Sequence, residues 1–189
     1  MSYLSNKIRI LKDAFMGNLM KLRVLYDIRL RKALTLSKRQ EPSVIVSLTS
    51  YGKRVKTSTV YTVYSLLRQT VRAERVVLWL NEDVFNNDNI PSDLRFLSKY
   101  GLDVHFCKDI GSYTKIIPSL SEFPDKHIIT ADDDLFYTKT FVEEFVEAHR
   151  LHPKAIITAC GKLPMLDSNQ EMVSYDSWPE YLWTPAHFQ

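Results

Sequence analysis

Apolar residues recur along the chain at two different spacings, which predict one long helix followed by alternating strands and helices. From residue 3 to residue 36 they recur at steps of three and four, as on one face of an α-helix, with basic residues around the rest of the wheel. The members of this face are Leu4, Ile8, Leu11, Phe15, Leu19, Leu22 and Tyr26. The polar segment 37–42, which ends in Pro42, predicts a boundary after this helix.

After this boundary, short β-branched runs alternate with segments of helical spacing. The runs predict buried strands over residues 44–51, 75–81, 102–107, 127–131 and 154–160. The spacing predicts helices over residues 57–69, 91–100, 113–120 and 139–151. Such alternation predicts an α/β fold with a mainly parallel sheet and helices on both faces. We therefore expect an N-terminal amphipathic helix over residues 1–40 and an α/β domain over residues 41–189.

The charge is unevenly distributed, although the net charge is only +3. Residues 1–40 hold ten Lys and Arg against two Asp, giving +8, and residues 41–189 hold fifteen against twenty acidic residues, giving −5. A basic amphipathic helix can lie on an anionic membrane, so we expect a peripheral membrane contact through residues 3–36. The alternatives are packing on the body or on a partner, and a simple solvated face. Nucleic acid is not an expected partner, because no basic patch is interleaved with aromatic residues.

The sequence also predicts a cytoplasmic location, on the inner face of the membrane if the helix binds lipid. No apolar run reaches the roughly 18 residues of a membrane span. Charges are scattered through the N-terminus, so it contains no apolar signal core. Cys107 and Cys160 lack CxxC spacing, and we interpret them as reduced core thiols.

Three consecutive aspartates, Asp132 to Asp134, directly follow the predicted strand 127–131, which we expect to be a central strand. Ligands of open α/β sheets bind at the carboxyl ends of the strands. Adjacent carboxylates repel one another, and a hard divalent cation such as Mg²⁺ or Mn²⁺ would remove the repulsion because it takes oxygen ligands. The alternative is a solvated acidic turn that caps the following helix. The position after a buried strand favours the metal.

A strand followed by three aspartates resembles the DxD motif of GT-A glycosyltransferases. Around it, four segments occur in the order VIVSLTSYGKRV, TVYSLLRQT, RVVLWLN and SYTKIIPSLSEFPDKHIITADDDLFY. Together they resemble bacterial, family-2-like glycosyltransferases of polysaccharide and lipopolysaccharide biosynthesis, over residues 43–165. The resemblance implies the Rossmann-like GT-A fold, a nucleotide-diphospho-sugar donor and a saccharide or lipid-linked acceptor. It also implies a divalent metal, Mn or Mg.

The resemblance also implies a nucleotide-sugar site. In GT-A enzymes the first strand and its loop line the nucleotide pocket, which here means Thr49, Ser50, Tyr51 and Arg54. An acidic or amide residue after the second strand often reads the base, and either Asn81 or Asp83 stands there. Lys115 precedes the acidic strand where these enzymes place a basic residue, commonly an arginine in family 2. Each of these residues could equally be an ordinary polar residue at a strand end or on the surface.

The same resemblance assigns roles to the three aspartates. Asp134 is expected to ligate the metal directly, and Asp132 to meet the ribose or a metal-bound water. Asp133 could do either. We therefore expect Asp132 and Asp134 at the metal, and Asp132 and Asp133 at the nucleotide sugar.

Inverting sugar transfer needs a base, which in GT-A enzymes is an acidic residue downstream of the DxD motif. The candidates are Asp167, Glu171, Asp176 and Glu180. We favour Asp176 and Glu180, because the surrounding segment 175–183 carries Trp178, Tyr181 and Trp183, which could stack on sugars or simply cover the sheet. His187 is a further candidate metal ligand.

Proteins that the chain resembles usually continue further, so it looks C-terminally shortened. This leaves two alternatives to an active glycosyltransferase: a catalytically incomplete nucleotide-sugar-binding module or interaction protein, and a nucleotidyltransferase. The latter usually has a glycine-rich loop after the first strand, and SLTSYGKR has one glycine. A plain structural α/β domain would bind no nucleotide.

Overall fold

The computed structural model describes residues 17–182. Its contacts divide the chain into two compact units, with the boundary between Glu144 and Phe145. The first unit begins with a helix over residues 17–29, here called the N-terminal helix. Its strands are β1 (Gln40–Thr49), β2 (Arg72–Asn81), β3 (Leu102–Cys107) and β4 (His127–Ala131). Its other helices are η1 (Gly52–Lys56), α2 (Ser58–Leu67), α3 (Ser92–Ser98), η2 (Gly111–Lys115) and α4 (Ile117–Glu122), where η marks a 3-10 turn.

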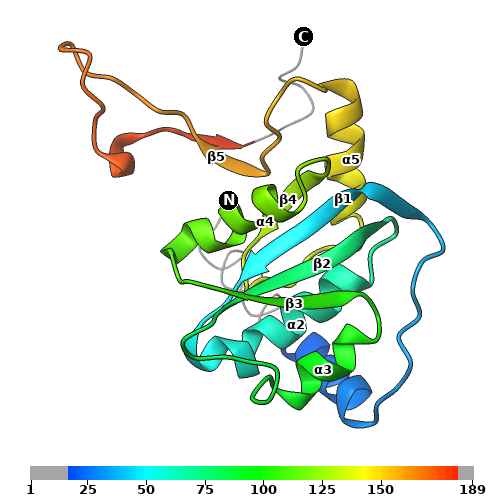
Figure 1. The fold of residues 1–189 in the computed structure, drawn as a ribbon. Coiled ribbons are helices and arrows are strands. Elements are labelled where there is room, and N and C mark those ends of the chain that lie inside the picture. The colour runs from blue at the N-terminus through cyan, green and yellow to red at the C-terminus, as the bar shows by residue number, and fades with distance from the viewer. Residues whose placement is uncertain (1–16, 183–189) are drawn as a thin grey trace, which may run out of the picture. The chain divides into compact units, whose positions relative to one another are not determined.

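These four strands form one parallel sheet in the order β3-β2-β1-β4 (Figure 1). Helices α2 and α3 contact each other on one face of the sheet, where α2 also meets β2 and α3 meets β3. The opposite face carries Ile45, Val77 and Trp79, which pack with Phe123 just after α4. The predicted α/β fold with a parallel sheet and helices on both faces is confirmed. The strands predicted over residues 102–107 and 127–131 coincide with β3 and β4.

Two predictions about the sheet are wrong. Residues 154–159 form no strand: they are turns and irregular backbone, and Ile156 is 97% exposed, whereas a buried strand needs its apolar side chains covered. The expected central strand β4 is an edge strand of the described sheet, beside β1 alone. In addition, β1 starts at Gln40, before the predicted residue 44, and its register shifts between Glu41 and Ile45 around Pro42, which has no N–H to donate.

The N-terminal helix ends earlier than predicted, at residue 29 instead of 36. Arg31 has a left-handed φ of 48°. Its N–H donates to the carbonyl of Ile28, and the N–H of Lys32 donates to the carbonyl of Asp27. This bond pattern is the Schellman motif that terminates helices. Glycine usually occupies the left-handed position, so an arginine there gave no stop signal in the sequence. The predicted start at residue 3 lies outside the described residues.

The N-terminal helix packs on the first unit through a narrow face. Val24 and Ile28 are 1% and 0% exposed. Asp27 accepts a hydrogen bond from the hydroxyl of Tyr64 on α2, at 2.6 Å. Arg31 lies 3.5 Å from a carboxylate oxygen of Asp93 on α3. The helix is thus part of the core around α2 and α3.

This packing predicts a contrast between two apolar residues of the helix. Ile28→Ala is expected to lower the free energy of unfolding by about 2 kcal/mol, because it leaves a cavity at a buried site. Leu22→Ala is the matched control, since Leu22 is 63% exposed, and should change it by less than about 0.5 kcal/mol. Urea denaturation of both variants measures the difference. Equal effects would show that this helix does not pack on α2 and α3.

Helix α5 (Phe141–Leu151) spans the boundary between the units. The second unit contains β5 (Cys160–Lys162), η3 (Tyr175–Ser177) and β6 (Glu180–Leu182), and β5 pairs with β6 in an antiparallel ladder. Within residues 17–182, none of the helices combines the length and the apolar character that crossing a bilayer requires. Cys107 is a free, half-buried thiol, and burial raises its pKa.

Candidate functional site

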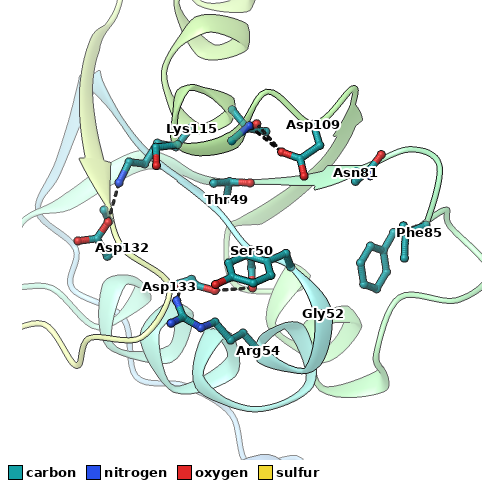
Figure 2. A pocket seen from close by; sticks show the side chains of 16 residues that line it. Thr49, Ser50, Gly52, Arg54, Asn81, Phe85, Asp109, Lys115, Asp132 and Asp133 are labelled. Atoms are coloured by element: carbon teal, nitrogen blue, oxygen red, sulfur yellow. Dashed lines mark hydrogen bonds and ion pairs between the residues drawn. The ribbon is translucent and has the colours of Figure 1, made fainter.

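A cavity of about 580 Å³ opens at the carboxyl ends of the four parallel strands (Figure 2). The last residues of β1, β2 and β4 and the loop after β3 contribute to its wall. The predicted site residues that line it are Thr49, Ser50, Tyr51, Arg54, Asn81, Lys115, Asp132 and Asp133. Asp83 and Asp134 do not line it: the backbone N–H of Asp83 donates to Oδ1 of Asn81 at 2.9 Å, and Asp134 pairs with Arg54 of the cavity wall. The fold therefore gathers in one place residues that lie up to about eighty positions apart in the chain.

Asp133 is the most enclosed of the three aspartates, with a side chain 6% exposed. Its Oδ2 accepts a hydrogen bond from the hydroxyl of Ser50 at 2.6 Å, and its Oδ1 accepts one from Nη1 of Arg54 at 2.9 Å. Since the Ser50 proton points to Asp133, the hydroxyl of Thr59 on α2 must donate to Ser50, 2.6 Å away. Both oxygens of Asp133 are thereby occupied by the protein, which favours a positioning role for this residue.

Asp132 points to the other side of the sheet and is 60% exposed. Its Oδ1 accepts from Nζ of Lys115 at 2.6 Å, as Figure 2 shows. Its backbone N–H donates to the phenol oxygen of Tyr137 at 2.8 Å. Burial, together with the neighbouring aspartates, raises the pKa of Tyr137 to about 12, so this phenol stays neutral beside the acidic residues. Asp132 is thus held by its backbone and keeps an accessible carboxylate.

Asp134 is 44% exposed, and its Oδ2 lies 3.2 Å from Nη1 of Arg54. Arg54 serves both Asp133 and Asp134, and the hydrogen bond with Asp133 raises the pKa of its guanidinium. Its guanidinium also lies over the ring of Tyr51, 5.2 Å from the centroid. The ring itself is 64% exposed at the cavity wall, where it offers an aromatic face.

The alternation of a β-strand explains why neighbouring aspartates have different surroundings. Successive side chains of a strand point to opposite faces of the sheet. Ile128 packs on the α4 face, and Asp132, four residues later, reaches Lys115 on that same side. Ala131 and Asp133 fall on the α2 face, where Ser50 and Arg54 lie. One carboxylate is therefore buried against α2, while the carboxylate before it remains open.

A buried polar stripe on α2 and its C-terminal end fixes the backbone of the acidic segment, and the sequence reading missed it. Its members are Thr59, Thr62, Ser65 and Gln69, all at most 4% exposed. The hydroxyl of Thr62 donates to the carbonyl of Leu135, and that of Ser65 accepts from the N–H of Tyr137. Gln69 donates to the carbonyl of Thr138 and accepts from the N–H of Val142. The available signal was the recurrence of polar residues at steps of three and four in an otherwise apolar helix.

Gln69 carries the most bonds of this stripe. Gln69→Leu is expected to lower the free energy of unfolding by about 2 kcal/mol, because it leaves the Val142 N–H and the Thr138 carbonyl without partners. Chemical denaturation measures this loss. Ser121→Ala, which removes an exposed hydroxyl bond to the Ile117 carbonyl, is the control and should be nearly neutral. A neutral Gln69→Leu would mean that α2 does not hold the acidic segment.

A second buried network positions Lys115. Nε1 of Trp79 donates to Oγ of Ser119 at 2.7 Å. The hydroxyl of Ser47 donates to the carbonyl of Lys115 and lies 2.8 Å from Oγ of Ser119. Ser47 and Ser119 are both 0% exposed. Strands β1 and β2 thereby fix the backbone that presents the lysine to Asp132.

The far end of the cavity offers one donor and one acceptor. Because Oδ1 of Asn81 already accepts from the Asp83 N–H, the amide nitrogen of Asn81 is left to donate. Oδ1 of Asp109 accepts from the N–H of Gly111 at 2.8 Å, which leaves its other oxygen to accept. Figure 2 shows both side chains at the same end of the cavity, with Phe85 beside them.

The exposed carboxylates suit a divalent cation. Asp132 and Asp134 present accessible oxygen ligands, and Mg²⁺ or Mn²⁺ is often held by one or two carboxylates with phosphate and water completing the shell. Each carboxylate is paired with a cationic side chain, which offsets part of the repulsion between the adjacent aspartates. Among residues 17–182, no cluster of three or more His, Cys, Asp or Glu suited to a metal occurs. A cation here would therefore rely on a bound phosphate for further ligands.

The candidates for the catalytic base lie in the second unit. Asp176 is an exposed residue of η3, and Glu180 is the first residue of β6. Asp167 instead organises a turn, since its Oδ1 accepts from the N–H groups of Asn169 and Glu171. Trp178 donates to the carbonyl of Val173 and packs on Tyr175, with ring centroids 5.2 Å apart. Trp183 and His187 lie outside the described residues.

Compared with known proteins, the chain matches no model of a protein family, and no curated protein is significantly similar to it.

Proposed function

We propose that the chain is a metal-dependent glycosyltransferase of the GT-A kind. It transfers a sugar from a nucleotide-diphospho-sugar to a saccharide or lipid-linked acceptor in surface polysaccharide synthesis, in the cytoplasm. The observation that carries the proposal is the cavity at the carboxyl ends of the parallel strands. The accessible carboxylate of Asp132 pairs there with Lys115, and Arg54 of the cavity wall pairs with the accessible carboxylate of Asp134 beside it. This arrangement provides both signs of charge that a metal–diphosphate complex requires.

The residues in and beside the cavity are proposed to bind three parts of the ligand: the base, the phosphates and the cation. Tyr51 stacks on the base, and the donor of Asn81 and the acceptor of Asp109 meet its polar edge. Lys115 and Arg54 turn from their carboxylate partners to the phosphate oxygens. Asp132 and Asp134 are then free to hold the cation. When bound, the cation neutralises the charge that develops on the leaving nucleoside diphosphate.

Buried groups keep these residues in place during binding. Asp133 remains bonded to Ser50, so the acidic segment keeps its shape when Arg54 moves to a phosphate. Ser47 and Ser119 keep the backbone of Lys115 in position.

Asp176 or Glu180 of the second unit is proposed as the base that removes the proton of the acceptor hydroxyl.

The released products test this proposal against its alternatives. The chain is incubated with UDP-, GDP- or CDP-sugars and Mn²⁺, and the free nucleoside diphosphate is measured. A glycosyltransferase releases the nucleoside diphosphate, with water as a slow acceptor when no sugar is present. In a parallel incubation with a nucleoside triphosphate and a sugar phosphate, a nucleotidyltransferase would instead release pyrophosphate. A module that only binds the donor releases neither, and either of these two results would contradict the proposed transfer.

A further inference from the structure

The N-terminal helix exposes an apolar face. Leu19, Leu22, Tyr26 and Leu30 are 51%, 63%, 56% and 55% exposed. They follow one another at steps of three and four, so they form one stripe along the helix and its last turn, here called the outer face. The predicted apolar face of this helix included the first three of these residues, and all three are exposed; its other members lie outside the described residues.

The helix packs on the first unit through a different face. At 3.6 residues per turn, Val24 and Ile28 lie about half a turn away from the centre of the outer face. These two residues are buried, and Asp27 and Arg31 bond to α2 and α3. The helix therefore has two apolar faces: a narrow one that packs on the first unit, and the outer face, which points away from it.

Basic side chains border the outer face. Arg23 and Arg29 fall on its two sides, and both are exposed. Neither makes an ion pair within the part of the chain that the structure describes. Lys32 lies over the ring of Tyr26, 4.3 Å from its centroid. The one acidic residue of residues 17–32, Asp27, is engaged by the Tyr64 hydroxyl.

We infer that the outer face docks on the surface of an anionic lipid bilayer. The apolar stripe enters the boundary between headgroups and acyl chains, and the flanking arginines meet lipid phosphates, as in interfacial amphipathic helices. A symmetric contact with a second copy fits less well, because it would bring like-charged arginines together without acidic partners. The inference does not depend on the proposed enzymatic activity.

Vesicle flotation of the full chain tests this docking without any nucleotide. Vesicles of phosphatidylcholine are compared with vesicles that also contain phosphatidylglycerol. The chain is expected to float with the anionic vesicles only, and less at high salt. Leu22→Asp is expected to weaken binding by about tenfold or more, since it places a charge on the apolar stripe. Ile156→Asp, at a 97% exposed site in the second unit, is the matched control and should bind like the parent chain.

Two further variants test the charges and do not alter the apolar stripe. Arg23→Gln and Arg29→Gln are each expected to weaken binding about fivefold, the loss expected for one basic residue near an anionic surface. Thermal denaturation checks that each variant is folded. Docking is refuted if the parent chain does not float, if it floats equally with neutral vesicles, or if the arginine variants bind unchanged. Concentration-dependent dimerisation that Leu22→Asp removes would assign the outer face to a second copy instead. None of these results bears on the nucleotide site, because the assay contains no nucleotide.

Discussion

Replacing Asp133 with alanine is expected to lower the free energy of unfolding by about 3 kcal/mol. Its carboxylate is 6% exposed and accepts hydrogen bonds from Ser50 and Arg54. Removal of one member of a buried ion pair costs about 3–5 kcal/mol, because its partner loses compensation. We expect the lower end of this range, since Arg54 is 42% exposed and keeps its contact with Asp134. Urea denaturation measures the loss.

The neighbouring aspartate provides the control. Asp132→Ala removes an ion pair whose carboxylate is 60% exposed, and such pairs contribute at most about 1 kcal/mol. The two substitutions are chemically identical and one residue apart, so only the surroundings differ. Equal losses for the two variants would contradict the buried role of Asp133.

The largest effect on binding is expected for Asp134→Asn. In the presence of Mn²⁺, this variant should bind UDP at least about a hundredfold more weakly, because it removes a proposed metal ligand. Even the groups that merely orient metal ligands cost about 10–100-fold when they are replaced. Its free energy of unfolding should change by less than about 1 kcal/mol, since Asp134 is 44% exposed. Calorimetric titration of UDP measures the affinity.

Asp83→Asn is the matched control for this substitution. It removes the same charge from an exposed residue, whereas Asp134 pairs with Arg54 of the cavity wall. Its affinity for UDP should equal that of the parent chain. If both variants weaken binding alike, the general negative charge of the protein matters and Asp134 is no ligand. If neither variant does, the cation lies elsewhere.

Together these predictions separate adjacent residues by function. Asp133 is expected to affect stability, whereas Asp134 is expected to affect binding. Asp133 and Asp134 both contact Arg54, and they differ in exposure, 6% against 44%. The alternation at the end of β4 separates Asp133, which turns towards α2, from Asp132, which turns towards Lys115. The alternation could have been predicted from the sequence, since Ile129, Ala131 and Asp133 are two residues apart and so point to the same face of the sheet. The resemblance to DxD motifs assigned roles mainly to the outer carboxylates and did not predict that Asp133 is buried between Ser50 and Arg54.

The order of strands and helices in the first unit was predictable because each apolar run is short and bounded by turn residues. The position of the cavity was also predictable, since the carboxyl ends of parallel strands meet at one edge of the sheet. The pairing of the strands was harder to predict from the sequence. Nothing in the segment HIITA indicates that β4 pairs with β1 and occupies the edge of the described sheet.

The remaining differences depend on tertiary packing, either its presence or its absence, which the local sequence does not reveal. Residues 154–159 have the β-branched composition of a strand but no layer that covers them. Arg31 adopts a left-handed conformation that arginine does not favour, and its contacts with Asp93 and the ring of Phe96 help to hold it there. The stripe with the strongest helical period in the N-terminal helix is exposed, because Val24 and Ile28 supply the packing instead.

The cavity is proposed to bind a nucleoside diphosphate together with a divalent cation. The most direct test is calorimetric titration of UDP, then GDP and CDP, into the chain with and without Mn²⁺. We expect one nucleoside diphosphate to bind per chain, and only in the presence of the cation. Absence of binding with every nucleotide, or equal binding without Mn²⁺, would contradict this proposal.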